Sequence, residues 1–362
     1  MIPTILTKLG NHLCRWSILA SLALNMACNS NTAGQYPFPI AGSKELSGPE
    51  VLPPMPLMSP RSLYLFPGNI LVLDKYDGEL ATRIPIDNPN FATRVFRIGN
   101  GPNEFLKLSN LYYDPASEEL EVVDGGLRKC YRLKYNRQLN VDGGDVLSVN
   151  TFADKVDLFT LVPFRGGYFS NGCFGAKMFT IFDKDLNELV VFGDYPGDQE
   201  GIGTRAFFLR NQTTLAVDPS GQYFCAAGVY TDWLVIYKVT GDHVTVNMEL
   251  FTGDAALETI SHTTKRGTSN SVVETGETRR TYRTLYAGNH YLYALYWGIK
   301  ASEMEDADAP CYVVKFSYDG EQVETYRYNK LLYSIAVDEE QGKMYGITYS
   351  PLEDARMLAF SI

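Results

Sequence analysis

The stretch LYYDPASEELEVVDGGLRKCYRLKY, residues 111–135, contains three short runs of β-forming residues separated by turn residues. Asp-Pro lies in the first turn and Gly-Gly in the second, and both dipeptides favour tight reversals of the chain. Three consecutive strands joined by tight turns predict an antiparallel sheet. The middle strand, ELEVVD at 119–124, ends in an acidic residue.

Five further segments resemble ELEVVD, and most of them end in Asp or a small polar residue. They are NILVLD (69–74), GYFSN (167–171), QYFCAA (222–227), HYLYALY (290–296) and KMYGIT (343–348). The last residues of the six copies are 50, 47, 56, 69 and 52 residues apart. A strand precedes most copies, a third strand follows each, and a fourth follows the first five. Four antiparallel strands repeated six times with a period of about 50 residues predict an all-β, six-bladed β-propeller.

The sixth copy ends at Ile362 after its third strand, so its fourth strand must come from elsewhere in the chain. The unassigned strand-like stretch is KELSGPEVL, Lys44–Leu52. We therefore expect an N-terminal strand to close the ring, because closure leaves no open sheet edge. The predicted propeller spans residues 44–362.

Composition limits the class of protein. The 362 residues are 45% hydrophobic, 13% aromatic and 20% charged, which is typical of a folded globular chain. Acidic residues number 42 against 32 Lys and Arg, giving a formal net charge of −10. Nucleic-acid-binding proteins carry an excess of Lys and Arg, so we expect no nucleic-acid partner.

The N-terminus has the pattern of a signal peptide over residues 1–27. Lys8 and Arg15 precede an apolar run of 11 residues, Trp16–Met26, and Ala27 precedes Cys28. This resembles the lipobox of bacterial lipoproteins, in which the Cys is lipidated and becomes the new N-terminus; ordinary cleavage with an incidental Cys28 is the alternative. Residues 28–43 would form a flexible tether. Cleavage would leave a formal charge of −12 on the mature chain, so the lipid rather than electrostatics would hold it at the membrane.

The segment GNGPNEF, Gly99–Phe105, leads into the second copy of the repeat. It resembles the G-x-GPGEF segment of TolB-like six-bladed propellers found as lipoproteins in gut Gram-negative bacteria, with Asn103 in place of the usual Gly. The resemblance covers residues 44–362. It implies a propeller in the cell envelope, at the outer membrane, and it implies no catalytic residues.

The long connections of the predicted propeller, 99–109, 193–212, 252–284 and 297–310, all open on one face. Long loops on a rigid scaffold usually carry function. The insertion Ser261–Thr284 contains five cations against Glu274 and Glu277, which indicates either recognition of an anionic group or a solvated polar loop. The candidate residues of this binding face are Glu104, Arg205, Arg210, Trp233, Lys265, Arg266, Arg279, Arg280, Arg283 and Trp297.

Other motifs indicate little chemistry. Asp183-Lys184-Asp185 begins like a calcium loop but lacks its Gly and its final Glu, so a hairpin turn is favoured. The acidic run from Glu303 to Asp308 suits a solvated face or a divalent cation, and the three His left after export are scattered. Glu104 suits either an acid–base role or capping of backbone amides. We expect no cofactor and no metal, and free thiols at Cys130, Cys173, Cys225 and Cys311.

These features predict a monomeric envelope module that binds a protein partner, a glycan or a peptide through its long loops. One alternative is a glycan-binding accessory lipoprotein, which requires Trp233 or Trp297 to be exposed beside a groove. Another is a lyase or hydrolase acting at the central channel.

Overall fold

The computed structural model describes residues 36–139, 141, 145–155, 158–196, 204–241, 243–253, 257–264, 267–304, 309–350 and 353–362. Contacts divide the chain into two units, Met1–Pro39 and Ile40–Ile362. Within the described ranges, no helix is long and apolar enough to cross a membrane. The predicted signal peptide and Cys28 lie outside these ranges.

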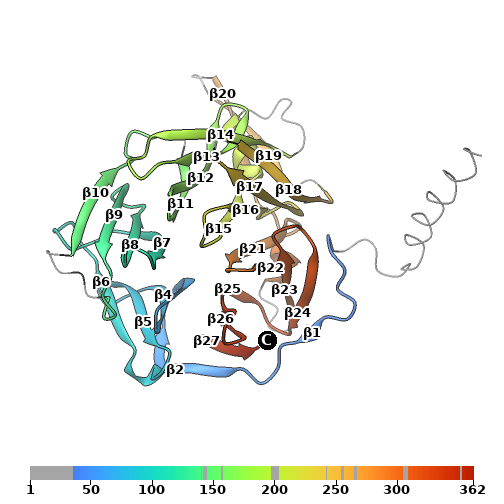
Figure 1. Ribbon diagram of the computed structural model, residues 1–362. Helices are drawn as coiled ribbons and strands as arrows, with labels where there is room; N and C mark the ends of the chain where they lie inside the picture. The colour runs from blue at the N-terminus through green and yellow to red at the C-terminus, as the bar shows by residue number, and fades with distance from the viewer. Residues whose placement is uncertain are drawn as a thin grey trace, which may run out of the picture. The chain divides into compact units, whose positions relative to one another are not determined.

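Six four-stranded antiparallel sheets of the second unit are arranged as blades around a central axis, which confirms the predicted six-bladed propeller (Figure 1). In blades one to five the first of the four consecutive strands is the innermost one, and in blade six the innermost strand is β25 (Leu332–Asp338). Blade one contains β3 (Pro60–Phe66), β4 (Asn69–Tyr76), β5 (Glu79–Pro85) and β6 (Thr93–Arg97). Blade two contains β7 (Leu108–Asp114), β8 (Glu119–Asp124), β9 (Lys129–Lys134) and β10 (Val146–Thr151). Blade three contains β11 (Leu158–Phe164), β12 (Gly167–Phe174), β13 (Lys177–Phe182) and β14 (Glu188–Asp194).

The remaining blades follow the same order. Blade four contains β15 (Thr213–Val217), β16 (Tyr223–Gly228), β17 (Trp233–Thr240) and β18 (His243–Phe251). Blade five contains β21 (Arg279–Ala287), β22 (Tyr291–Lys300), β23 (Cys311–Ser317) and β24 (Gln322–Tyr328). Blade six contains β25 (Leu332–Asp338), β26 (Lys343–Ser350) and β27 (Glu353–Ser361). The six repeats quoted above are the second strands.

An N-terminal strand closes the ring, as expected, but its bounds differ from the prediction. The closing strand is β2 (Glu50–Leu57), which pairs antiparallel with β27. The first part of the predicted stretch forms a separate strand, β1 (Lys44–Glu45), which pairs parallel with β24 as a fifth strand of blade five. Gly48, at a positive φ of 57°, and Pro49 lie between them, and a left-handed Gly followed by Pro interrupts an extended strand.

The insertion 252–284 is not one loop. It contains a two-stranded hairpin, β19 (Glu258–Thr264) and β20 (Gly267–Val273), and the first six residues of the inner strand β21. The short helices are α2 (Thr204–Arg210), η1 (Pro89–Phe91) and η2 (Ala301–Glu303). The sequence analysis assigned the start of β21 to a loop because of its three arginines, although its Thr and Tyr residues favour a strand.

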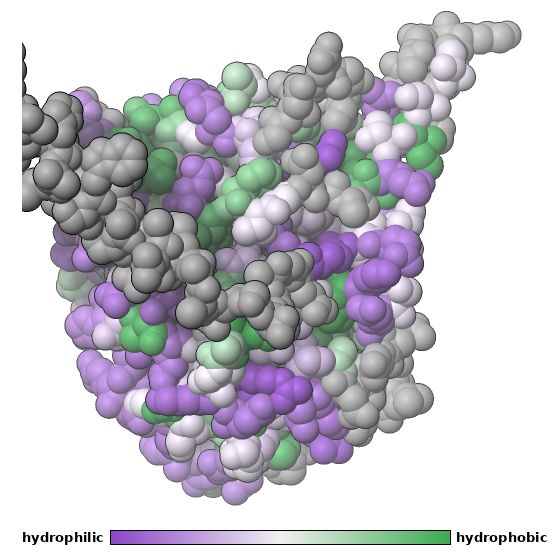
Figure 2. Space-filling model, turned by 90° about the vertical axis from the view of Figure 1, so that its right-hand side faces the viewer, coloured by the Kyte–Doolittle hydropathy of each residue, from purple (hydrophilic) through white to green (hydrophobic). Residues whose placement is uncertain are grey.

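The core lies between the blades and is rich in aromatic side chains. Phe169, Phe179 and Phe192 of blade three pack with Trp233 and Tyr237 of blade four. Large apolar side chains buried in this way supply most of the favourable free energy of folding. The wall that carries β18, β24 and β1 shows mainly hydrophilic residues with scattered hydrophobic ones (Figure 2).

The polar residues that end several of the second strands tie consecutive blades together. Asp74 accepts hydrogen bonds from the backbone amides of Met58 and Ser59, at 3.0 and 2.6 Å. Asn171 accepts the amide of Thr160 in its own blade, at 3.0 Å, and its side-chain amide donates to the hydroxyl of Thr213 in blade four, at 2.9 Å. These side chains are buried. The polar residue that ends the repeat therefore accepts hydrogen bonds from backbone amides that would otherwise be buried without a partner.

Candidate functional site

Neighbouring strands in each blade are antiparallel, so the connections fall into two sets at opposite ends of the propeller. We call one end the long-loop face: it carries the connections from each fourth strand to the next blade and from each second strand to the third. The other end is the short-turn face. The predicted sorting of long connections has one exception, because residues 135–145 between β9 and β10 also form a long connection, on the short-turn face.

Glu104 caps its own loop. Its carboxylate accepts the amide of Gly101 at 2.8 Å, and a Cβ on Gly99 would overlap that carboxylate. Phe105 is buried and packs edge-on against Phe96. The GNGPNEF segment therefore needs glycine at positions 99 and 101 because Glu104 fills the space beside them. Glu104 faces a hollow of about 430 Å³ beside outer strand β6. Of the two roles predicted for Glu104, its contact with Gly101 fits the capping of backbone amides.

The two candidate tryptophans are buried, with exposed fractions of 1% for Trp233 and 2% for Trp297. The indole of Trp233 donates to Glu249 at 2.9 Å, and that of Trp297 donates to the carbonyl of Leu332 at 2.7 Å. Neither ring is available to stack on a ligand at the surface. The placement of these residues on an exposed binding face was wrong, because both rings pack between blades, Trp233 against Phe179 of blade three and Trp297 against Tyr333 of blade six.

Other candidates are placed less completely. Lys265 and Arg266 lie outside the described residues, as does the side chain of Arg205. Arg210 is half-buried at the end of α2. The acidic run of residues 305–308 is also outside the described part of the chain.

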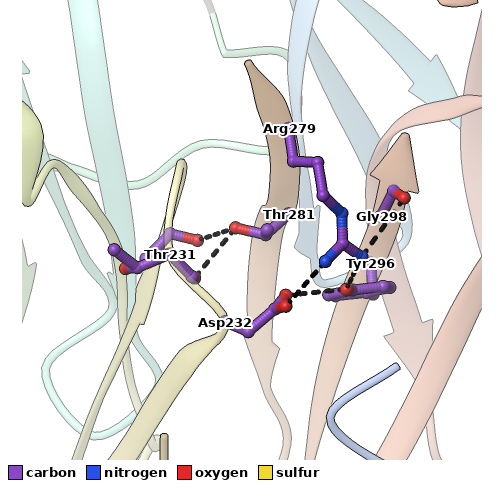
Figure 3. A network of polar contacts seen from close by, with 7 residues as sticks. Thr231, Asp232, Arg279, Thr281, Tyr296 and Gly298 are labelled. Carbon is purple, nitrogen blue, oxygen red and sulfur yellow. Dashed lines mark hydrogen bonds and ion pairs between the residues drawn. The ribbon is translucent and has the colours of Figure 1, made fainter. Parts of the chain in front are cut away.

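The structure gathers the remaining three candidates, Arg279, Arg280 and Arg283, on inner strand β21. Arg279 donates to Asp232 at 3.0 Å and to the hydroxyl of Tyr296 at 2.9 Å (Figure 3). The Tyr296 hydroxyl in turn donates to Asp232 at 2.7 Å. This closed network joins blades four and five, so Arg279 has a structural partner.

Arg280 also has a carboxylate partner. Its Nε and Nη2 donate to the two oxygens of Glu274, both at 2.6 Å. Burial, the largest single effect, lowers the pKa of Arg280, but the hydrogen bond with Glu274 and the nearby negative charge together outweigh it and leave the pKa raised. A bidentate pair of this kind holds the guanidinium in one orientation.

Arg283 differs from both. Its guanidinium lies 5.4 Å from the ring centre of Trp297 and 5.7 Å from that of Tyr333, on the inner strand of blade six. Its Nε is buried without a hydrogen-bond partner, and no described carboxylate forms an ion pair with it. Burial, followed by the nearby charge of Arg280, lowers the pKa of Arg283. Sequence reasoning missed Tyr333, although it begins the sixth repeat directly after a connection on the long-loop face.

The short-turn face has a cavity of about 920 Å³. Its charged lining is mixed: Arg83, Arg137, Lys343, Asp87, Asp338, Glu339 and Glu340. Glu339 accepts the backbone amides of His290 and Tyr291, so part of this charge is already used by the turns.

Three features bear on metal and thiol chemistry in the part of the chain that the structure describes. That part contains no cluster of three or more His, Cys, Asp and Glu side chains placed to hold a metal ion. Asp183 accepts the amides of Asp185 and Asn187, at 2.9 and 2.8 Å, as in the predicted hairpin turn. Cys130, Cys173, Cys225 and Cys311 are free thiols, and burial raises the pKa of Cys130 and Cys311 to about 12.

The fold and the position of these residues define a six-bladed propeller with three arginines on one of its inner strands. The chain belongs to the DUF5128 family, described as a 6-bladed β-propeller, whose model matches residues 56–354. No curated protein matches the sequence.

Two similar solved structures come from Bacteroides. One is a member of the DUF4221 family from Bacteroides vulgatus, with 11% identity, a TM-score of 0.54, and coverage of 86% of this chain and 95% of that one. The other, provisionally described as an exported protein of Bacteroides fragilis, has 12% identity, a TM-score of 0.51, and coverage of 88% and 95%. At these identities the likeness shows the fold alone.

Proposed function

We propose that this protein is an exported, lipid-anchored propeller that binds an anionic group of its ligand on the long-loop face, with Arg283 as the receiving residue. The observation that carries the proposal is the contrast among three arginines of one strand. Arg279 and Arg280 each pair with a carboxylate, whereas Arg283 has aromatic rings around it and a buried Nε without a partner.

An unpaired cation in this position is unfavourable for folding. Desolvating a charge costs free energy unless an opposite charge or hydrogen bonds offset the cost, and arginine does not escape it by deprotonating at neutral pH. Aromatic faces offset part of the cost. A carboxylate, sulfate or phosphate group placed beside Arg283 would accept from its guanidinium and supply the missing charge.

The N-terminal sequence supports the location. The basic residues Lys8 and Arg15, the apolar run and Cys28 have the order of a lipoprotein signal, and residues 28–43 would link the lipid to the propeller. The proposal places the protein among TolB-like lipoproteins of the outer membrane, acting as a monomer. Burial of both tryptophans removes the main support for a carbohydrate-stacking site, so charge rather than stacking is the basis of recognition.

The test is thermal unfolding of the mature protein with glucuronate, sulfate or phosphate. At least one of these anions should raise the Tm of the native protein, because a ligand that binds the folded state stabilises it. Arg283→Met should abolish that shift and raise the Tm measured without anion, since it removes an unpaired charge but keeps much of the packing.

Arg137→Met, at the exposed rim of the short-turn cavity, is the matched control and should retain the anion-dependent shift. A native protein that responds to none of the three anions, or an Arg283→Met variant that responds as the native protein does, would contradict the proposal.

A further inference from the structure

A second group of cations lies on the long-loop face, across blades one to three. Two adjoining hollows of about 350 and 280 Å³ share Arg61, Leu73, Lys107 and Leu108 in their linings. Lys75 lines the smaller hollow and Arg128 the larger. We call this surface the cationic groove, defined by Arg61, Lys75, Lys107 and Arg128.

The carboxylates beside the groove do not neutralise these cations. Asp74 is fully buried as a side chain and pairs with Arg94 at 2.6 Å, while its other oxygen accepts the amides of Met58 and Ser59. Asp124 is also buried, and its oxygens accept four backbone amides, those of Leu106, Lys107, Gly126 and Leu127. The carboxylates of Asp74 and Asp124 are therefore buried, and their oxygens already accept hydrogen bonds from other groups of the protein.

The four cations of the groove form no ion pair with any described residue. Arg61 and Lys107 are exposed, and Arg128 is oriented by bonds to the carbonyls of Phe152 and Lys155, at 3.0 and 2.7 Å. Cations that lie together without counter-charges repel one another. On a chain of net charge −10, this groove is a local concentration of positive charge.

The groove and Arg283 lie around the same end of the central channel. Tyr333, which contacts Arg283, is followed on β25 by Ser334, whose hydroxyl accepts the amide of Leu63 at 3.1 Å. Leu63 lies two residues after Arg61 on β3. A path of adjacent residues on inner strands thus leads from Arg283 to the first cation of the groove.

We infer that the ligand of the long-loop face is an oligoanion, a chain that carries several carboxylate, sulfate or phosphate groups. One group binds at Arg283 and the others bind along the cationic groove. This inference rests on the proposed function and names its ligand class. Separate cationic positions around one opening match repeated anionic groups better than a single charge, because each contact adds to the affinity of the whole chain.

The experiment is calorimetric titration of the mature protein with a short oligogalacturonate, a sulfated oligosaccharide and a short polyphosphate, which separate the three sources of anionic group. Neutral maltooligosaccharide is the ligand control. The native protein should bind at least one oligoanion more tightly than the corresponding monomer. Raising the salt from about 50 to about 200 mM should weaken binding.

The double variant Arg61→Gln with Lys107→Gln should lose about tenfold or more in affinity and show a weaker dependence on salt. Both side chains are exposed, so the fold should be unchanged. The double variant Lys134→Gln with Arg137→Gln removes two exposed cations from the short-turn end and should bind as the native protein does.

The outcomes separate the two proposals. Retained affinity in the groove variant, with binding lost in Arg283→Met, would overturn the oligoanion inference and leave the proposed function standing. Equal affinity for monomer and oligomer, or no binding of any oligoanion by a native protein that responds to small anions, would also overturn the inference. Failure of the native protein to respond to any anion would contradict the proposed function itself.

Discussion

The two faces of the propeller use their carboxylates differently. On the long-loop face, Asp74 accepts two amides from the connection that enters blade one, and Asp124 accepts two from the connection that enters blade two besides two from its own turn. The four cations of the groove remain without an ion pair among the described residues. On the short-turn face, Asp218 accepts the amides of Ser220, Gln222 and Tyr223 within its own hairpin. The cavity on that face mixes both signs of charge.

This difference indicates a division of tasks. On the short-turn face, Asp183 and Asp218 act within their own hairpins, whereas Glu339 of blade six accepts amides from the turn of blade five. Acidic residues on the long-loop face hold connections between strands of the ring while leaving positive charge at the surface. Contacts that stabilise the ring and the residues of the proposed anion site thus lie at the same end of the molecule.

The largest expected effect comes from removing the connection that enters blade one. A chain that starts at Ser59 lacks β1, β2 and one of the two amides bound by Asp74, as well as buried Leu52 and Leu57. We expect its Tm to fall by about 10 °C or more, because each buried leucine contributes roughly 1.5–3 kcal/mol. A chain that starts at Ile40 is the control. Equal melting of the two truncated chains by differential scanning calorimetry would refute the closure role of β2.

A smaller effect should distinguish the two kinds of carboxylate. Asp124→Ala leaves four backbone amides without their acceptor and should lower the free energy of unfolding by about 3 kcal/mol. Asp183→Ala opens one exposed hairpin and should cost about 1 kcal/mol or less. Urea denaturation of both variants measures the difference. Equal losses of unfolding free energy in the two variants would contradict this difference between the two faces.

The smallest effect concerns pH. The Asn187 side chain, together with the amides of Asn187 and Asp185, lowers the pKa of Asp183 below its ordinary value of 3.8. Because this pKa is lower in the folded state, ionised Asp183 stabilises that state at pH values above its ordinary pKa. The contribution is lost as the pH falls through the lowered pKa. Native protein and Asp183→Asn should therefore differ at neutral pH and converge in acid. A difference in Tm that stays constant down to about pH 2 would argue against this role.

The repeat was readable from the sequence because every second strand is apolar and bounded by turns, and several end in a polar residue that the fold needs. The bounds of the closing strand were not readable, because β1 has two residues and joins its sheet in parallel, which leaves no alternating pattern. Arg279–Thr284 was taken as loop because arginines on an inner strand resemble those of a solvated segment.

The candidate site was predicted in part. Local charge singled out Arg279, Arg280 and Arg283, but their partners decide their roles. Asp232 lies 47 residues from Arg279, and Tyr333 lies on another blade, so only the closed ring brings them together. The cationic groove was missed for the same reason, since Arg61 and Lys107 belong to different repeats.

Strand β1 has a mechanical consequence under the proposed lipid anchor. Lys44 and Glu45 pair with β24, and each forms an ion pair with that strand, to Glu324 and Arg327 respectively. Tension applied from the N-terminal side of the chain reaches this short parallel pairing before it reaches β2. In a chain anchored as proposed, we expect this pairing to open before β2 does and so to delay the opening of the ring.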